Sequence, residues 1–218
     1  MTSTRTTLAG ALEAPDASVR LAAALRAGAV PDPALVGVLV ARCELEPDFF
    51  VRDMLTWALT RHRSDQVVDA VLPELASPDS RARSQAVRTL SKVADLRTWP
   101  AVLALLDDPD DDVARAAWRT AVRLVPAGRE AGLAEELTRR LGRGDDDVRL
   151  SLSRALVGLG EAAEEPLARA LGHPDEAVRT HAVATRHLAR QPDAGYECAL
   201  ATARRAVVLH GAPLVDGA

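Results

Sequence analysis

The chain has 218 residues, of which 48% are hydrophobic and 27% charged, and its formal net charge is −4. This length permits one extended core, and the acidic balance argues against a surface made for nucleic acid. Cys43 and Cys198 stand far apart without disulfide or metal spacing, which fits a reducing cytoplasm. There is no apolar run of about 18 residues and no hydrophobic signal segment, so we expect a cytoplasmic protein that does not cross a membrane.

An acidic turn followed by the start of an Ala/Leu-rich helix occurs six times along the chain. The apolar residue three positions after each turn aspartate recurs every 30–35 residues. Repetition at this period is typical of a stacked array in which each unit buries its apolar face against its neighbours. The six positions are Val19, Val51, Ala82, Val113, Val148 and Val178.

Each turn aspartate is placed to act as a helix N-cap, since its carboxylate can accept from the free N–H groups of the first turn. The apolar residue then starts a stripe that continues at +4, +7 and +8, as in Val51, Leu55, Ala58 and Leu59. This spacing is helical and not strand-like. The predicted caps are Asp16, Asp48, Asp79, Asp110, Asp145 and Asp175.

The segments between these turns supply a partner helix for each unit. In chain order they run over residues 3–12, 33–43, 67–76, 99–106, 130–141 and 162–171, with a closing helix over 196–209. The sequence therefore predicts an all-α, right-handed α-solenoid of about six helical hairpins without strands. We expect one domain over residues 1–218, with repeats near 3–30, 33–63, 65–95, 98–126, 129–160 and 161–190 and a C-terminal helix at 195–210.

An arginine follows the apolar position in five of the six repeats. It lies four residues beyond the capping aspartate, so it can pair with that aspartate or with the counterpart in the next repeat. We interpret these arginines as a structural ladder without a ligand role. They are Arg20, Arg52, Arg83, Arg149 and Arg179.

The recurring core Asp-x-x-Val-Arg-x-x-Ala resembles the short HEAT-like repeats of phycobilisome-lyase-type proteins. The resemblance covers about residues 3–190, and the fourth repeat departs from it with Ala114 and Arg115. It implies the fold strongly and the function weakly. The lyases of that family attach bilins to partner proteins, but only the repeat core matches them.

The stretch Phe49–His62, with Ala41-Arg42-Cys43 before it and Arg83–Lys92 after it, also resembles a HEAT-like module appended to MerR-type transcription regulators of high-GC bacteria. The resemblance continues through residues 142–156. In such regulators the module senses an effector or contacts a partner. No DNA-reading element carries over to this chain. The resemblance implies an effector-binding or protein-binding domain.

Cations collect on the second helices of the central repeats. At 100° per residue, position +6 projects off the core-facing stripe, and +10 follows one turn later. In a HEAT-like stack the second helices line the concave surface, so this row predicts a groove for an anionic and partly flat ligand. The alternative is a set of solvated arginines paired with neighbouring acids. Position +6 holds Trp57, Arg88, Arg119 and Arg154, and position +10 holds Arg61, Lys92 and Arg123.

Aromatic residues are concentrated in the second repeat. Phe49 and Phe50 stand where small polar residues are expected, so either a ligand or partner covers them or they fill a gap beside the loop 42–47. Trp118 either faces the groove beside Arg119 or wedges between repeats. Trp99 is expected to be core.

Enzymatic and metal-dependent functions find little support. The histidines do not pair at helical ligand spacing, and the catalytic motifs that contain a nucleophilic serine or a phosphate-binding loop are absent from the sequence. The aspartate-rich turns lack the spacing of a calcium loop and are better explained as helix caps. HEAT-like DNA glycosylases use tryptophans and an aspartate, for which Trp57, Trp118 and Asp53 qualify, but they need a strongly cationic surface.

The sequence thus favours a non-enzymatic scaffold that binds a protein or peptide through its concave helix face. The alternative is a sensor whose anionic or aromatic small molecule lies in the groove near Trp57. We expect no catalytic residue, metal or cofactor, and no binding of nucleic acid. We also expect a monomer, unless the patch of Phe49 and Phe50 pairs with itself.

Overall fold

The computed structural model describes the backbone of residues 2–192 and 195–211 and the side chains of residues 7–192 and 195–207. Within these ranges every regular element is an α-helix or a short 3-10 helix, and no strand is present. The chain forms two compact units, Met1–Leu124 and Val125–Ala218.

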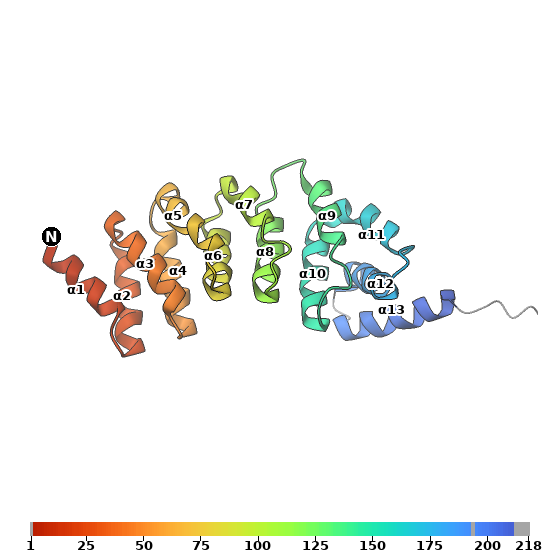
Figure 1. The fold of residues 1–218 in the computed structure, drawn as a ribbon, viewed down its shortest axis with the longest axis horizontal. Coiled ribbons are helices and arrows are strands. Elements are labelled where there is room, and N and C mark those ends of the chain that lie inside the picture. The colour runs from red at the N-terminus through yellow and green to blue at the C-terminus, as the bar shows by residue number, and fades with distance from the viewer. Residues whose placement is uncertain (1, 193–194, 212–218) are drawn as a thin grey trace, which may run out of the picture. The chain divides into compact units, whose positions relative to one another are not determined.

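The first unit contains four consecutive helical hairpins (Figure 1). The second helix of each hairpin packs beside the second helix of the next, so that α2, α4, α6 and α8 form one layer, while α3 and α5 contact each other in the other layer. The α-helices are α1 (Thr2–Leu12), α2 (Ala17–Ala29), α3 (Val36–Leu45), α4 (Phe49–Thr60), α5 (Ser64–Val71), α6 (Ser80–Val93), α7 (Trp99–Leu103) and α8 (Asp111–Arg123).

All six turn aspartates cap a second helix, as predicted. Asp110, for example, accepts from the backbone N–H groups of Asp112 and Val113 at 3.0 and 3.2 Å. Asp145 accepts from Val148 in the same manner. These carboxylates satisfy N–H groups that have no partner within the helix and fix where each second helix begins. The capped helices are α2, α4, α6 and α8 in the first unit and α10 and α12 in the second.

The apolar stripe of each second helix forms the core. Val51, Leu55, Ala58 and Leu59 are at most 1% exposed. Apart from α1, the partner helices are shorter than predicted, and several of them begin or end in 3-10 turns, where the i→i−4 hydrogen bonds stop. These turns are η1 (Pro33–Leu35), η2 (Leu72–Ala76), η3 (Leu96–Thr98) and η4 (Gly160–Ala163).

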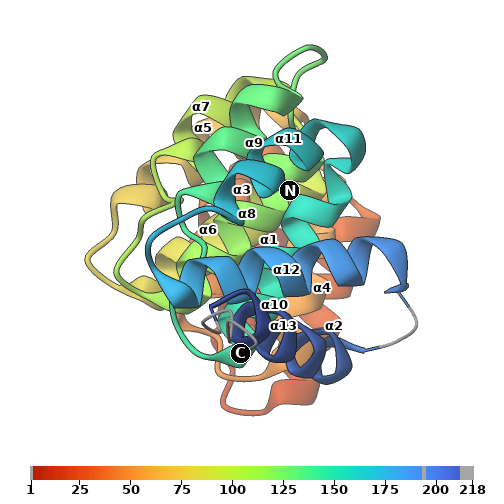
Figure 2. The ribbon, with the colours of Figure 1, turned by 90° about the vertical axis from the view of Figure 1, so that its right-hand side faces the viewer.

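The second unit holds two further hairpins and a closing helix. Its helices are α9 (Glu130–Thr138), α10 (Asp146–Gly158), α11 (Glu164–Ala170), α12 (Glu176–Arg190) and α13 (Tyr196–Gly211). Figures 1 and 2 show α13 running across α12. Ala184 of α12 and Tyr196, Ala199, Leu200 and Ala203 of α13 share a buried cluster that holds the two helices together.

The predicted all-α fold is confirmed over the described residues, with four hairpins in the first unit and two in the second. Trp99 is core, as expected, and its indole Nε1 donates to the carbonyl of Ala121 at 3.0 Å.

Candidate functional site: a cationic groove on the second helices of the first unit

Arginines from three neighbouring helices line one groove of the first unit. The groove contains a cavity of about 570 Å³ between α4, α6 and α8. We call this surface the cationic groove and define it by five residues of the cavity wall. They are Arg52 of α4, Arg88 and Lys92 of α6, and Arg119 and Arg123 of α8.

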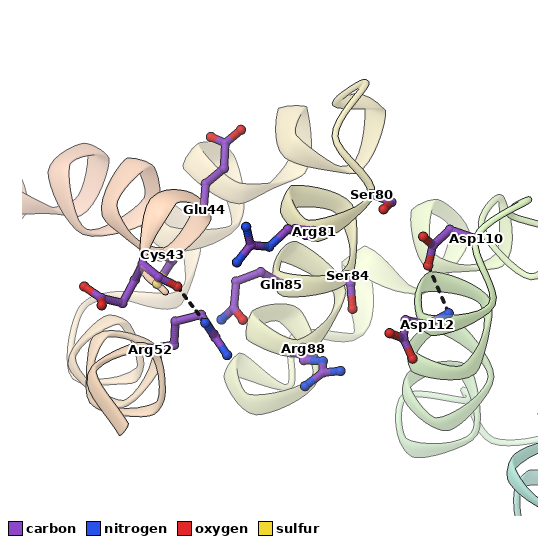
Figure 3. Close-up of a pocket in the computed structure, with 11 residues that line it drawn as sticks. Cys43, Glu44, Arg52, Ser80, Arg81, Ser84, Gln85, Arg88, Asp110 and Asp112 are labelled. Atoms are coloured by element: carbon purple, nitrogen blue, oxygen red, sulfur yellow. Dashed lines mark hydrogen bonds between the residues drawn. The ribbon is translucent and has the colours of Figure 1, made fainter. Parts of the chain in front are cut away.

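A second cavity of about 280 Å³ continues the groove along α6 (Figure 3). Arg52, Gln85 and Arg88 line both cavities. Figure 3 shows Arg52 on α4 and Gln85 and Arg88 on α6, with Asp110 and Asp112 at the beginning of α8. The groove therefore has a cationic centre and carboxylates at its margin.

The basic residues of the groove differ in whether an acidic side chain neutralises their charge. Lys92 donates to Asp53 of α4. Arg88, Arg119 and Arg123, by contrast, form no ion pair with any residue that the structure describes. The groove thus retains cationic charge that the protein itself does not neutralise.

Arg119 lies close to other cations. Burial lowers its pKa, and repulsion from Arg88 and Arg115 lowers it further, while Asp112 opposes the shift. Its residue surface is exposed, so an anion can reach it. A guanidinium remains charged under such conditions, and an anionic group placed here would relieve the repulsion between the arginines.

The arginine ladder explains how Arg52 comes to line the groove. In the first repeat Arg20 donates through Nη1 to the carbonyls of Ala14 and Pro15, and through Nε and Nη2 to the carboxylate of Glu46, at 2.7 Å each. Arg83 repeats this geometry with the carbonyls of Ser77 and Pro78 and with Asp108. The paired acid lies two residues before the cap of the next repeat, so the predicted pairing with a capping aspartate is wrong.

Arg52 has the same anchor but no paired acid. Its Nη1 donates to the carbonyls of Glu46 and Pro47. The residue two positions before the next cap is Ser77, whose hydroxyl accepts from Asp79 N–H just as Glu46 accepts from Asp48 N–H. No carboxylate among the described residues pairs with the Nε and Nη2 of Arg52, in contrast to Arg20 and Arg83.

The phase argument from the sequence therefore brings Arg88, Lys92, Arg119 and Arg123 together as expected. It does not identify Arg52 or Gln85, which lie at +1 and +3. The signal for Arg52 was present, since Ser77 breaks the spacing at which Glu46 and Asp108 follow Arg20 and Arg83.

Phe49 and Phe50 form an exposed aromatic pair beside the groove. They are 61% and 70% exposed, and their rings meet edge to face with centroids 5.7 Å apart. Phe49 lines the larger cavity. The alternative in which these residues fill an internal gap is wrong, because the neighbouring loop does not cover them.

Two tryptophans predicted for the groove lie elsewhere. Trp118 is 0% exposed and its Nε1 donates to the carbonyl of Leu106 at 3.0 Å, so its place is the core. The ring of half-buried Trp57 lies against Gly28 of α2 and lines neither cavity. Helical phase does not determine the path that a large side chain takes toward a neighbouring element.

The other two predicted cations lie apart from the groove walls. Arg61 is exposed at the end of α4 and lines neither cavity. Arg154 is exposed on α10 of the second unit.

The structure shows no metal centre within the described residues, where no three His, Cys, Asp or Glu side chains converge. Among the helices of residues 2–192 and 195–211, none has the length and apolar character to span a membrane.

The groove lies within a region that is similar to HEAT repeats. Residues 46–123 match the family model for HEAT repeats, and they include every residue that defines the groove.

Comparison with whole proteins gives likenesses to solved repeat structures, while no curated protein sequence matches the chain. An engineered protein is 20% identical with a TM-score of 0.44, over 91% of this chain and 96% of its own. A designed armadillo repeat protein is 17% identical with a TM-score of 0.42, over 83% and 98%. The complex of CpcE and CpcF of phycocyanin lyase from Nostoc sp. PCC7120 is 20% identical with a TM-score of 0.38. The match covers 92% of this chain and 93% of that one.

Proposed function

We propose that this chain is a non-enzymatic scaffold that binds a protein or peptide partner through the cationic groove. One observation carries the proposal: Arg88, Arg119 and Arg123 face a cavity without a carboxylate partner among the described residues, while Arg20 and Arg83 of the same unit are paired. Arginine is well suited to interfaces, because its fork donates two parallel hydrogen bonds to a carboxylate and its face packs on aromatic rings.

The extent of the surface supports a macromolecular ligand. Two adjoining cavities follow three helices, and an exposed pair of phenylalanines lies at one side. Exposed aromatic groups beside unpaired arginines are typical of the residues that dominate the affinity of protein interfaces.

Selection from a random peptide display library tests this proposal. Peptides selected on the wild-type protein should lose binding to an R88Q/R119Q double variant, whose circular dichroism and melting should stay close to wild type. If the enriched peptides bind both proteins equally, their site lies elsewhere and the groove does not serve this function.

A second candidate is a sensor for an anionic or aromatic small molecule, as the resemblance to MerR-associated modules implies. The larger cavity, at about 570 Å³, falls within the range of about 300–1,000 Å³ that is common for small-molecule sites. A thermal-shift screen of anionic and aromatic compounds tests it, since a bound ligand raises the melting temperature by mass action. If a compound raises the melting temperature of R88Q/R119Q as much as that of the wild type, the compound does not bind in the groove.

A further inference from the structure

We propose that the cationic groove binds an extended acidic segment of a partner protein, in which carboxylates at every third residue face Arg52, Arg88 and Arg119 in turn. The inference rests on the proposed function and adds the chemistry and register of the ligand.

The register follows from the way in which the three helices are packed. Each arginine comes from a different second helix, and α6 contacts both α4 and α8. Packed helices lie about 8–10 Å apart. An extended chain advances about 3.3 Å per residue, so about three residues bring it from one helix to the next.

Carboxylate is the ligand that the first unit itself selects for this arginine geometry. Glu46 and Asp108 each receive the Nε and Nη2 groups of an arginine whose Nη1 is fixed by two carbonyls. Arg52 has the same anchor and lines both cavities. A glutamate or aspartate from a partner can therefore form with Arg52 the bidentate pair that Ser77 does not supply.

Acids at the margin of the groove favour a peptide over nucleic acid. Glu44, Asp110 and Asp112 line the smaller cavity, and Asp53 lines the larger one. A phosphate backbone carries charge continuously and would meet these carboxylates, whereas a peptide can place a neutral residue opposite each. Its charges can be confined to the positions of the arginines.

The aromatic pair indicates an apolar residue at one end of the segment. Phe49 precedes Arg52 by one turn on the same face of α4, and both line the larger cavity. An apolar side chain before the first carboxylate would cover part of the exposed ring of Phe49. The expected motif is thus an apolar residue followed by three acidic residues at every third position.

Fluorescence anisotropy with short labelled peptides tests the register. One peptide carries leucine followed by glutamates at every third position, with serine and glycine at the positions in between. Two others have the same composition with glutamates at every second or every fourth position, and another replaces glutamate by glutamine. We expect the first to bind about tenfold more tightly than the others, with an affinity that falls as salt rises.

Charge-removing variants then locate the peptide. R88Q and R119Q should each weaken binding about tenfold, while R61Q, at the C-cap of α4 and outside the cavity walls, should change it by less than about twofold. S77D places a carboxylate where Glu46 and Asp108 stand in the other repeats. It should compete for Arg52 and weaken peptide binding while the fold becomes no less stable.

Equal affinity for all glutamate spacings, or binding that R88Q and R119Q leave unchanged, would overturn the inference. Tighter groove-dependent binding of single-stranded oligonucleotide or pyrophosphate than of the peptide would also overturn it. If display selection yields groove-dependent peptides without spaced acids, the proposed function stands and this inference fails. If it yields no groove-dependent peptide, the proposed function fails too.

Discussion

The ring of Trp57 lies directly over the backbone of Gly28, so that α2 and α4 approach closely at this point. A β-carbon at Gly28 would lie 2.3 Å from Trp57 Cζ3 and 2.9 Å from the Cα of Ala58. Because one of these neighbours is backbone, a side-chain rotation alone cannot relieve the overlap.

Gly28→Ala should therefore destabilise the protein by about 1–3 kcal/mol, as is typical of overpacking. Urea unfolding measures the change. Gly37→Ala is the matched control, since it lies in helix α3 with nothing within 4 Å of an added β-carbon. It should stabilise by up to about 1 kcal/mol, because alanine is the better helix former. Equal effects of both substitutions would show that Trp57 does not pack on Gly28.

Ala94 ends α6 in the left-handed conformation, with φ 58° and ψ 37°. This backbone region costs a residue with a β-carbon about 1–2 kcal/mol. Ala94→Gly should raise the free energy of unfolding by about 1 kcal/mol. Ala104→Gly is the control, because Ala104 follows α7 with a φ of −62°, where alanine is not strained. This substitution should lower the free energy of unfolding. A loss of stability in Ala94→Gly would contradict the assigned conformation.

Glu46 is a carboxylate without solvent exposure that accepts from Arg20, Arg42 and the N–H of Asp48. Glu46→Gln should cost about 3–5 kcal/mol, because it leaves buried guanidinium groups without a counter-charge. Chemical denaturation gives the value. Glu44→Gln, two residues earlier and half-buried, should cost less than about 1 kcal/mol. Comparable losses in the two variants would argue against a buried ion-pair network.

Acid should weaken this network in a defined window. Burial alone would raise the pKa of Glu46, but hydrogen bonds from Arg20, Asp48 N–H and Arg42 outweigh it and lower the pKa to about 2, from an ordinary value of 4.5. A depressed carboxyl pKa contributes stability that is present above pH 4.5 and lost as pH falls toward 2. The loss should be absent in Glu46→Gln, and an equal loss in both proteins would assign it to other carboxylates.

His181 gives the second unit a separate pH dependence. Burial lowers its pKa to about 4, with Arg149 adding repulsion, while a hydrogen bond to the Arg149 carbonyl and the charge of Asp146 oppose the shift. Its Nδ1 accepts from the N–H of Gly142 at 3.0 Å. The folded ring is therefore neutral with its proton on Nε2, beside the Arg149 carbonyl and the Ser153 hydroxyl.

Protonation would put a second donor against Gly142 N–H. The unfolded state consequently binds more protons between pH 6.5 and 4, and stability should fall by about 3 kcal/mol as pH drops through this window. Urea unfolding of the wild type and of His181→Gln at each pH isolates the contribution. If both proteins share one pH profile, His181 does not titrate as described.

The periodic part of the fold could be predicted because each element has a local cause. Asp110 caps α8 by accepting from the N–H groups of Asp112 and Val113. Such contacts join residues that are close in the sequence, so a short sequence pattern predicts them. Arg88 and Arg119 could be assigned to one face for the same reason, since helical phase depends only on sequence spacing.

Contacts between repeats were harder to predict. The partner of Arg20 is Glu46 and not a capping aspartate. This pairing depends on how close the segment that contains Glu46 lies to the turn of the preceding repeat. Trp118 is buried with its indole N–H donating to the carbonyl of Leu106, which lies in the turn between α7 and α8. The two-unit grouping and the exposure of Phe49 likewise depend on packing between elements distant in sequence.

The ladder of the first unit also gives the array a direction. In both pairs the earlier repeat supplies the arginine and the next repeat supplies the acid. Fragments separated at such a boundary carry complementary ends and can reassociate in one order only. The boundary at which Arg52 faces Ser77 lacks such a pair and is crossed instead by the exposed ion pair of Lys92 and Asp53, in which the later repeat supplies the cation. An engineer who divides the array there would separate this exposed pair and leave the pairs of Arg20 and Arg83 intact.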